Sequence, residues 1–130
     1  MGTSPRFSDT ILVDVASTIP DDAELVIATV TGVTSRYTDQ AIKLHGWANI
    51  SPDADASQCA LTIRVGTITG TIVGAAAIDL PATTQLLALE CDGVHDATEV
   101  ANQTYVLTAT MTGASSTSTV ESCAVTARVD

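Results

Sequence analysis

From about Leu25 to Val129 the chain reads as one short strand after another, separated by turns rich in Gly, Pro, Asp and Ser, and four of the segments alternate apolar and polar residues with a period of two. A period of two sends successive side chains to opposite faces of a strand, whereas an amphipathic helix needs a period near 3.6. No stretch of any length has the helical period. The pattern therefore predicts an all-β domain built as an antiparallel β-sandwich of about eight strands.

The expected elements can be placed by residue number. They are strands at 11–15, 24–33, 41–50, 59–65, 84–91, 103–112 and 119–129, with a glycine-broken hairpin around 66–74. In the segments from 41, 59, 103 and 119, one side of the alternation is apolar and should face the core. Residues 24–33 are apolar on both sides, which is typical of a strand covered on both faces. We expect residues 1–9 to be a flexible arm and residues 10–130 to form the sandwich domain.

Charge narrows the choice of partners. Fifteen Asp and Glu against five Lys and Arg give a formal net charge of -10, which repels phosphate backbones and anionic lipid head groups. We therefore expect neither nucleic acid nor a membrane as partner. The chain also lacks the apolar run of about 18 residues that a membrane-spanning helix needs. Met1–Asp9 lacks the basic and apolar regions of a signal peptide, so we expect synthesis and assembly in the cytoplasm.

Three cysteines, an odd number, leave at least one thiol outside any disulfide. Cys59 and Cys123 fall on the apolar sides of their expected strands, and Cys91 ends another. These positions favour three buried, reduced thiols over a disulfide framework.

No set of residues has the arrangement of a catalytic site. Two histidines and no plausible Ser, His and acid combination argue against a hydrolase, so we expect no enzyme and no cofactor. Asp92–Asp96 combines carboxylates with an imidazole in one expected loop, but Asp and Gly are also ordinary turn residues. We therefore assign no metal site, and cation binding by the acidic loops stays open.

The most suggestive surface is the polar side of residues 41–50, where Lys43, His45 and Trp47 point away from the core. A Trp beside polar groups on an open strand has three interpretations. It anchors a subunit or partner interface, it is covered by another part of the same chain, or it stacks on a sugar ring.

Two segments carry a family resemblance. Ile63 and Arg64 lead into a Gly- and Thr-rich hairpin within residues 61–74, and Tyr105-x-Leu107 forms a core pattern within residues 103–115. In both respects the chain resembles small virion proteins of tailed phages with a jelly roll like that of the tumour-necrosis-factor superfamily. The resemblance spans roughly residues 23–129, and Val65 departs from it where such chains often have a second arginine.

The resemblance implies a homotrimeric capsid decoration or cement protein on the virion surface, bound to the major capsid protein or another virion protein. The candidate interface residues are then Arg6 and Phe7 in the arm, Lys43, His45 and Trp47 on the open strand, and Arg64. The alternative is a carbohydrate-binding or adhesin-like module, including a tail or spike component, with Trp47 as its platform.

Overall fold

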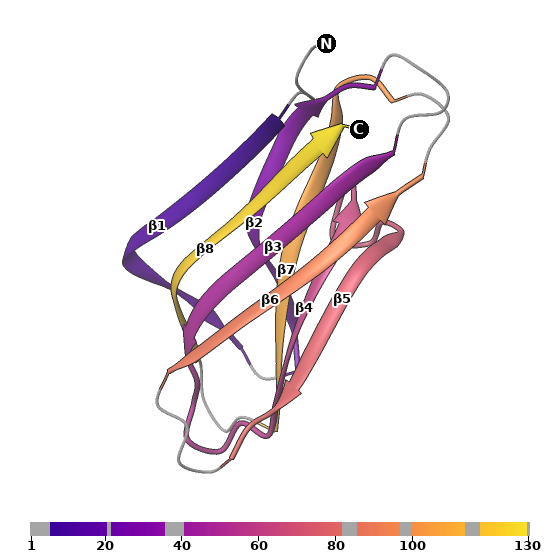
Figure 1. Ribbon diagram of the computed structural model, residues 1–130. Helices are drawn as coiled ribbons and strands as arrows, with labels where there is room; N and C mark the ends of the chain where they lie inside the picture. The colour runs from indigo at the N-terminus through magenta and orange to yellow at the C-terminus, as the bar shows by residue number, and fades with distance from the viewer. Residues whose placement is uncertain are drawn as a thin grey trace.

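The computed structural model describes residues 6–20, 22–35, 41–81, 86–96, 100–113 and 118–129, and only the backbone over 6–17. These residues form eight strands (Figure 1): β1 (Arg6–Ile19), β2 (Glu24–Val33), β3 (Ile42–Ser51), β4 (Gln58–Val65), β5 (Ile72–Asp79), β6 (Leu87–His95), β7 (Gln103–Thr112) and β8 (Ser118–Val129). Among the described residues there is no helix of the length and apolarity that a membrane crossing requires.

The strands pair as the two halves of one long hairpin. β1 pairs with β8, β2 with β7, β3 with β6 and β4 with β5, all antiparallel. The hairpin is then rolled up, which adds the β3–β8 and β4–β7 ladders. This nested pairing is a jelly roll, and it confirms the predicted fold class.

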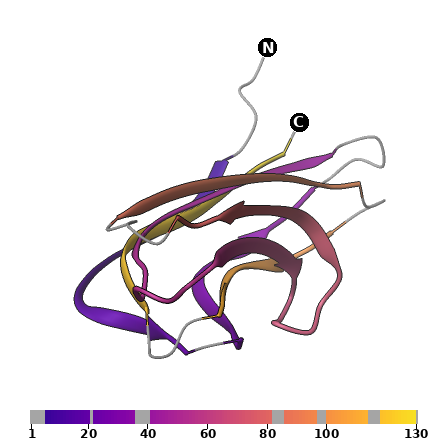
Figure 2. The same ribbon diagram turned by 90° about the horizontal axis from the view of Figure 1, so that it is seen from below.

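The resulting order β1-β8-β3-β6-β5-β4-β7-β2 divides into two packed layers, which Figure 2 shows in a view along the sandwich. The first four strands form one layer and the last four form the other. Among the residues that the structure describes, one ladder pair joins the two layers, between Gly74 of β5 and Gly93 of β6. A Cβ atom at either position would lie 2.5 Å from a backbone oxygen of the opposite strand, so only glycine allows the two backbones to approach this closely.

The core lies between the layers and consists of the inward sides of the strands. The four apolar alternations expected from the sequence are confirmed, because all their members are buried except the half-buried Val65. The buried members are Ile42, Leu44, Gly46, Ala48, Ile50, Cys59, Leu61, Ile63, Tyr105, Leu107, Ala109, Met111, Cys123, Val125, Ala127 and Val129. Aliphatic side chains dominate this core, in keeping with the low aromatic content.

All three cysteines are buried and none forms a disulfide, as predicted. Removal from water disfavours a thiolate. Burial accordingly raises the pKa of Cys59 and of Cys91 to about 11 each.

The expectation that residues 24–33 are covered on both faces is wrong. β2 forms a ladder with β7 alone and is therefore an outer strand, and Val26 on it is exposed. Its pairing register shifts between Val26 and Ala28, which leaves Ile27 as an extra residue. Such a bulge breaks the strict alternation, so the neighbours Ile27 and Ala28 are both buried. The continuous apolar run reflects this bulge.

Three boundaries also differ from those expected. β1 begins at Arg6, so the arm boundary at residue 9 falls inside a strand, while residues 1–5 lie outside the described ranges. β6 continues to His95, so most of the expected Asp92–Asp96 loop is a strand. The hairpin expected around 66–74 is present as the antiparallel β4–β5 pair, but its second strand begins at Ile72 and continues to Asp79, and Gly66 in the connecting loop has a positive φ of 83°.

Candidate functional site: the outer face around Trp47

β3 lies in the middle of its layer, between β8 and β6, and presents a row of side chains to the outside. Lys43 is exposed, and His45, Trp47 and Asn49 are half-buried. We call the outward residues of the three strands the Trp47 face: Lys43, His45, Trp47 and Asn49 of β3, Ala88, Glu90, Asp92 and Val94 of β6, and Ser122, Ala124, Thr126 and Arg128 of β8.

Trp47 has a small residue on one side and an acidic residue on the other. In register it lies opposite Ala124 of β8 and Glu90 of β6. Ala124 points outward yet is only 2% exposed, so larger neighbours cover it. Within the described ranges, no group accepts a hydrogen bond from the Trp47 indole. The indole N–H is therefore available to a binding partner.

A shallow hollow of about 510 Å³ lies beside Trp47 on the β6 side. Its lining includes Asn49, Ala88 and Glu90 in addition to the indole. The Asn49 amide donates a hydrogen bond to the Ser122 hydroxyl (3.0 Å). The hollow thus combines an aromatic ring with an amide and a carboxylate, which are groups that can bind either a protein surface or hydroxyl groups.

The polar side of the Trp47 face centres on His45. Its Nδ1 lies 2.7 Å from Oδ1 of Asp92, and its Nε2 lies 3.8 Å from Oε1 of Glu90. The two carboxylates are largely exposed, so each contact contributes at most about 1 kcal/mol to folding. The contacts orient the imidazole beside Trp47 and leave the carboxylates accessible from outside.

One end of this face carries a row of basic residues. Lys43 lies in register with Arg128, and Arg128 with Arg6 of β1. Three of the five Lys and Arg residues of the chain therefore occupy adjacent positions across three strands. Lys43 and Arg128 thus place two positive charges at this end of the Trp47 face of an acidic chain.

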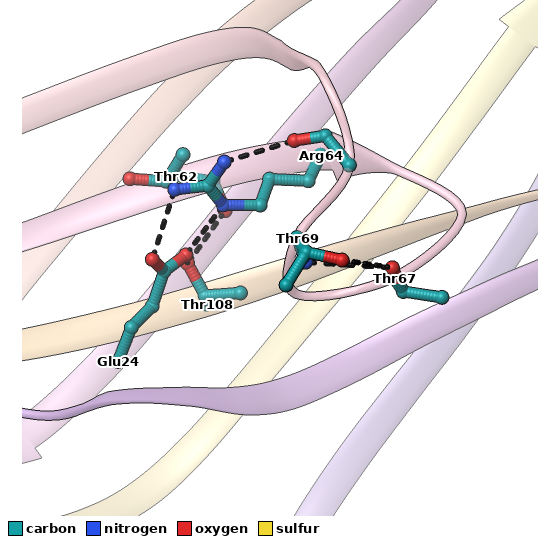
Figure 3. Close-up of polar contacts among 7 residues, drawn as sticks. Glu24, Thr62, Arg64, Thr67, Thr69 and Thr108 are labelled. Carbon is teal, nitrogen blue, oxygen red and sulfur yellow. Dashed lines mark hydrogen bonds and ion pairs between the residues drawn. The ribbon is translucent and has the colours of Figure 1, made fainter.

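Arg64 belongs to a separate cluster on the outer face of the other layer (Figure 3). Its guanidinium binds Glu24 through two hydrogen bonds, Nε to Oε2 (2.7 Å) and Nη2 to Oε1 (2.9 Å), and Nη1 donates to the carbonyl of Gly70 (2.9 Å). The buried Thr108 donates its hydroxyl to the same carboxylate (2.5 Å). The cluster ties β2, β7 and β4 to the loop before β5.

This arrangement perturbs the ionisation of the pair. Hydrogen bonding to Arg64 lowers the pKa of Glu24 despite the opposing effect of burial, and Thr108 lowers it further. The same bond raises the pKa of Arg64. Bidentate pairing of this kind is a strong charge-assisted interaction, and it gives Arg64 a structural role within the chain.

The candidate interface residues therefore lie on different parts of the sandwich. Lys43, His45 and Trp47 lie together, whereas Arg64 lies on the opposite layer. Arg6 is in register with Arg128 and Phe7 with Ala127, so the two residues occupy alternate positions of β1. Arg6 shares the register of the Trp47 face and Phe7 does not. The side chains of both lie outside the described part of the chain.

Sequence reasoning missed the acidic partners. Glu90 and Asp92 complete the Trp47 face, and Glu24 neutralises Arg64. The alternation in residues 87–95, with Ala88, Glu90, Asp92 and Val94 on one side, carried a signal for the first two. Nothing in the local sequence pairs Glu24 with Arg64, because they are 40 residues apart.

His95 occupies the opposite face of β6 from Asp92. Its Nδ1 lies 2.6 Å from the hydroxyl of buried Tyr105, and the two rings meet edge to face. Burial raises the pKa of Tyr105. Because Asp92 and His95 point to opposite sides of a strand, they do not form the ligand set considered for an Asp92–Asp96 loop. Within the described residues, no three His, Cys, Asp or Glu side chains gather to hold a metal ion.

Comparison with solved structures bears on the fold. The VP2 protein of infectious bursal disease virus, in T=1 particles, is 10% identical over 95% of this chain and 31% of VP2, with a TM-score of 0.60. A VP2 subviral particle gives 10% identity, 95% and 33% coverage and a TM-score of 0.55. Eiger TNF from S. frugiperda is 10% identical over 99% of this chain and 94% of that chain, with a TM-score of 0.50.

The chain spans about a third of the VP2 chains that it matches. No family model matches the sequence, and no curated protein matches it. At 10% identity these likenesses concern the fold alone. The chain is thus a jelly-roll β-sandwich of an architecture that viral capsid and TNF-like proteins share.

Proposed function

We propose that this chain is a structural virion protein that decorates the outside of a viral capsid and stabilises the shell through protein–protein contacts. The observation that carries the proposal is the Trp47 face. It is a broad sheet surface with an aromatic side chain at its centre, small residues beside it and charges of both signs around it. Its jelly-roll architecture, shared at the level of fold with VP2, agrees with such a role.

The chemistry of the face suits a protein partner. Trp is enriched among the residues that contribute most to interfaces, especially where neighbouring groups exclude water from it. The exposed Ala88 leaves room beside the indole for a partner's side chain, and the half-buried position of Trp47 limits its loss of rotamer freedom on binding. His45 and its two carboxylates supply hydrogen bonds at the edge of the contact.

The proposed partner is the major capsid protein or another virion protein, and the proposed active form is a homo-oligomer, with three copies as the expected number. The basic row at Lys43 and Arg128 would approach an acidic patch of the shell, and the acidic residues around His45 a basic one. Contacts of this kind mainly determine orientation and the rate of association, while Trp47 contributes most of the affinity.

The test is cosedimentation with capsids that lack this protein, prepared from the virus that encodes it. Wild-type protein should pellet with the particles. Trp47→Ala should reduce the bound fraction at least about tenfold, since loss of an interface Trp costs 2 kcal/mol or more, by general estimate. Val26→Ala, which truncates an exposed apolar side chain on the other layer, is the matched control. Equal binding of both variants and wild type would remove the Trp47 face from the contact.

A second function is favoured by the hollow beside Trp47. A ring flanked by the Asn49 amide and the Glu90 carboxylate is a suitable platform for a sugar, which stacks on the indole and exchanges hydrogen bonds with the polar groups. Trp47 is the only tryptophan of the chain, so its fluorescence reports on this site alone. A saturable change on titration with soluble oligosaccharides, absent in Glu90→Ala, would support glycan binding over capsid decoration.

A further inference from the structure

Exposed apolar side chains gather on one side of the sandwich. Of the six large hydrophobic residues that are exposed in the described part of the chain, five lie between residues 68 and 94. They are Ile68 in the loop before β5, Ile72 and Ile78 on β5, Leu86 just before β6, and Val94 on β6. Only Val26 lies elsewhere. Scattered exposed apolar residues need no explanation, but a concentration of this kind marks a contact surface.

β5 supplies most of this surface. It forms a ladder with β4 on one side, whereas on the other side, within the described residues, its one ladder pair with β6 is Gly74–Gly93. Past this pair, Ala75 and Ala77 are exposed on the outer side of β5, and Ile78 is 40% exposed although its register partner is the fully buried Cys59. The seam between the layers therefore opens to solvent along β5.

β5 also lacks the usual protection of an open edge. Proteins normally place Lys, Pro or inward-pointing charges on such strands to prevent pairing with other chains. In β5, Ile72 to Asp79, the one charged residue is the last. Its eight residues extend over roughly 26 Å, long enough for a continuous apolar contact.

We propose that copies of this chain associate through the β5–β6 strip, defined as Ile72, Ala75, Ala77, Ile78 and Leu86, and that the Trp47 face stays free for another partner. The proposal deepens the proposed function, because it assigns self-association and partner binding to different surfaces of one subunit.

A second copy is the occupant that the charges favour. Each copy carries a formal charge of -10, so two copies repel each other unless their contact excludes acidic groups. The strip meets this condition, because none of its five members is charged. Contact between two copies of the Trp47 face would remove Glu90, Asp92, Lys43 and Arg128 from water, which costs free energy unless each charge finds a partner. Burial of the strip's apolar side chains then stabilises the assembly.

The experiment measures the mass of the full chain by native mass spectrometry and sedimentation velocity. The test variant is Ile72→Ser with Leu86→Ser. Ile72 is 53% exposed and Leu86 is 62% exposed, so the substitutions should leave the fold intact. We expect wild type to form an oligomer and the variant to dissociate with a dissociation constant at least about tenfold higher. Trp47→Ala and Val26→Ser should keep the wild-type mass.

The proposal is overturned if wild type is a monomer, or if the double variant keeps the oligomer while Trp47→Ala loses it. Should the double variant fail to fold, hydrogen exchange of wild type decides the question. Backbone amides of residues 75–79 should exchange more slowly in the oligomer than after dilution to monomer, and equal rates would contradict the strip. Capsid binding is measured separately, so failure of decoration leaves this test unaffected.

Discussion

The two outer faces of the sandwich use polar side chains in opposite ways. On the layer that contains β4, Arg64, Glu24 and Thr108 bind one another, and their side chains are largely withdrawn from water. On the layer that contains β3, His45, Glu90 and Asp92 touch only at their tips and remain accessible. The first arrangement satisfies its own hydrogen bonds, and the second leaves them available. The difference separates a structural cluster from a recognition surface, although both include charged residues on exposed strands.

The largest loss of stability in either cluster should come from Arg64→Ala. The substitution leaves the Glu24 carboxylate, whose side chain is 24% exposed, without its cation, and it frees the loop before β5. We expect a loss of about 2–3 kcal/mol in the free energy of unfolding, between the values typical of exposed and buried pairs. Urea denaturation measures it. Asp92→Ala is the control on the other face, because it removes an exposed carboxylate that contacts His45, and it should change stability by less than about 1 kcal/mol. A larger loss for Asp92→Ala would reverse the assignment.

Low pH should reduce the stability difference between wild type and Arg64→Ala. The pKa of Glu24 is lowered in the folded protein from an ordinary value of 4.5, chiefly by its hydrogen bond to Arg64. A lowered carboxyl pKa stabilises the fold above the unfolded value, and this contribution disappears as the pH falls through the folded pKa. The stability gap between wild type and Arg64→Ala should therefore be constant above about pH 5 and narrow below pH 4.5. A gap that widens in acid would contradict the pairing.

A smaller effect should separate two threonines. Thr108→Val removes a hydroxyl that is fully buried and bound to the Glu24 carboxylate, whereas Thr126→Val removes a half-buried one with a long contact of 3.5 Å to the His45 carbonyl. Hydrogen bonds to charged groups contribute about 1.5–3 kcal/mol, and part of that returns when an isosteric methyl fills the site. We expect Thr108→Val to lower the free energy of unfolding by about 1 kcal/mol and Thr126→Val to leave it unchanged, as measured by thermal denaturation.

The smallest expected difference is in the reactivity of the thiols, which are buried between the two layers. Cys59 lies inside β4 and Cys91 inside β6, and burial raises the pKa of each to about 11. At pH 8 both should react very slowly with a disulfide reagent, and three thiols should react after denaturation. β6 adjoins the open seam, so Cys91 should be modified before Cys59. Mass mapping gives the order, and faster labelling of Cys59 would show that the seam does not open.

Much of the fold could be predicted because strand periodicity is local. The inward positions of β3, β4, β7 and β8 follow from alternation alone, and the limits of residues 103–112 agree with β7 to the residue. The failures lie where a non-local contact overrides the pattern. The bulge at Ile27 breaks the alternation in β2, so its sequence is apolar on both sides although the strand is not covered on both faces. Pairing with β3 extends β6 through most of the expected Asp92–Asp96 loop.

For the candidate site, sequence reasoning identified Lys43, His45 and Trp47 as one outward row, since they alternate with core residues on a single strand. It also named Arg64 as a candidate interface residue, without placing it relative to that row. Arg64 lies on the other layer and binds Glu24. Two outward rows look alike in sequence, because alternation records which side of its own strand a residue takes and carries no information about the layer to which the strand belongs.

The sequence by itself determined the strands, the core sides of most of them and the burial of the three thiols, because each depends on neighbours within a few residues. Only the tertiary structure decided which outward residues meet. Glu90 reaches the side of Trp47 through the β3–β6 register, and Arg64 reaches Glu24 across β7. Likewise, only the rolling of the hairpin left β5 at an open seam with its apolar residues exposed. Cross-strand neighbours are set by register and layer order, which the whole chain determines together.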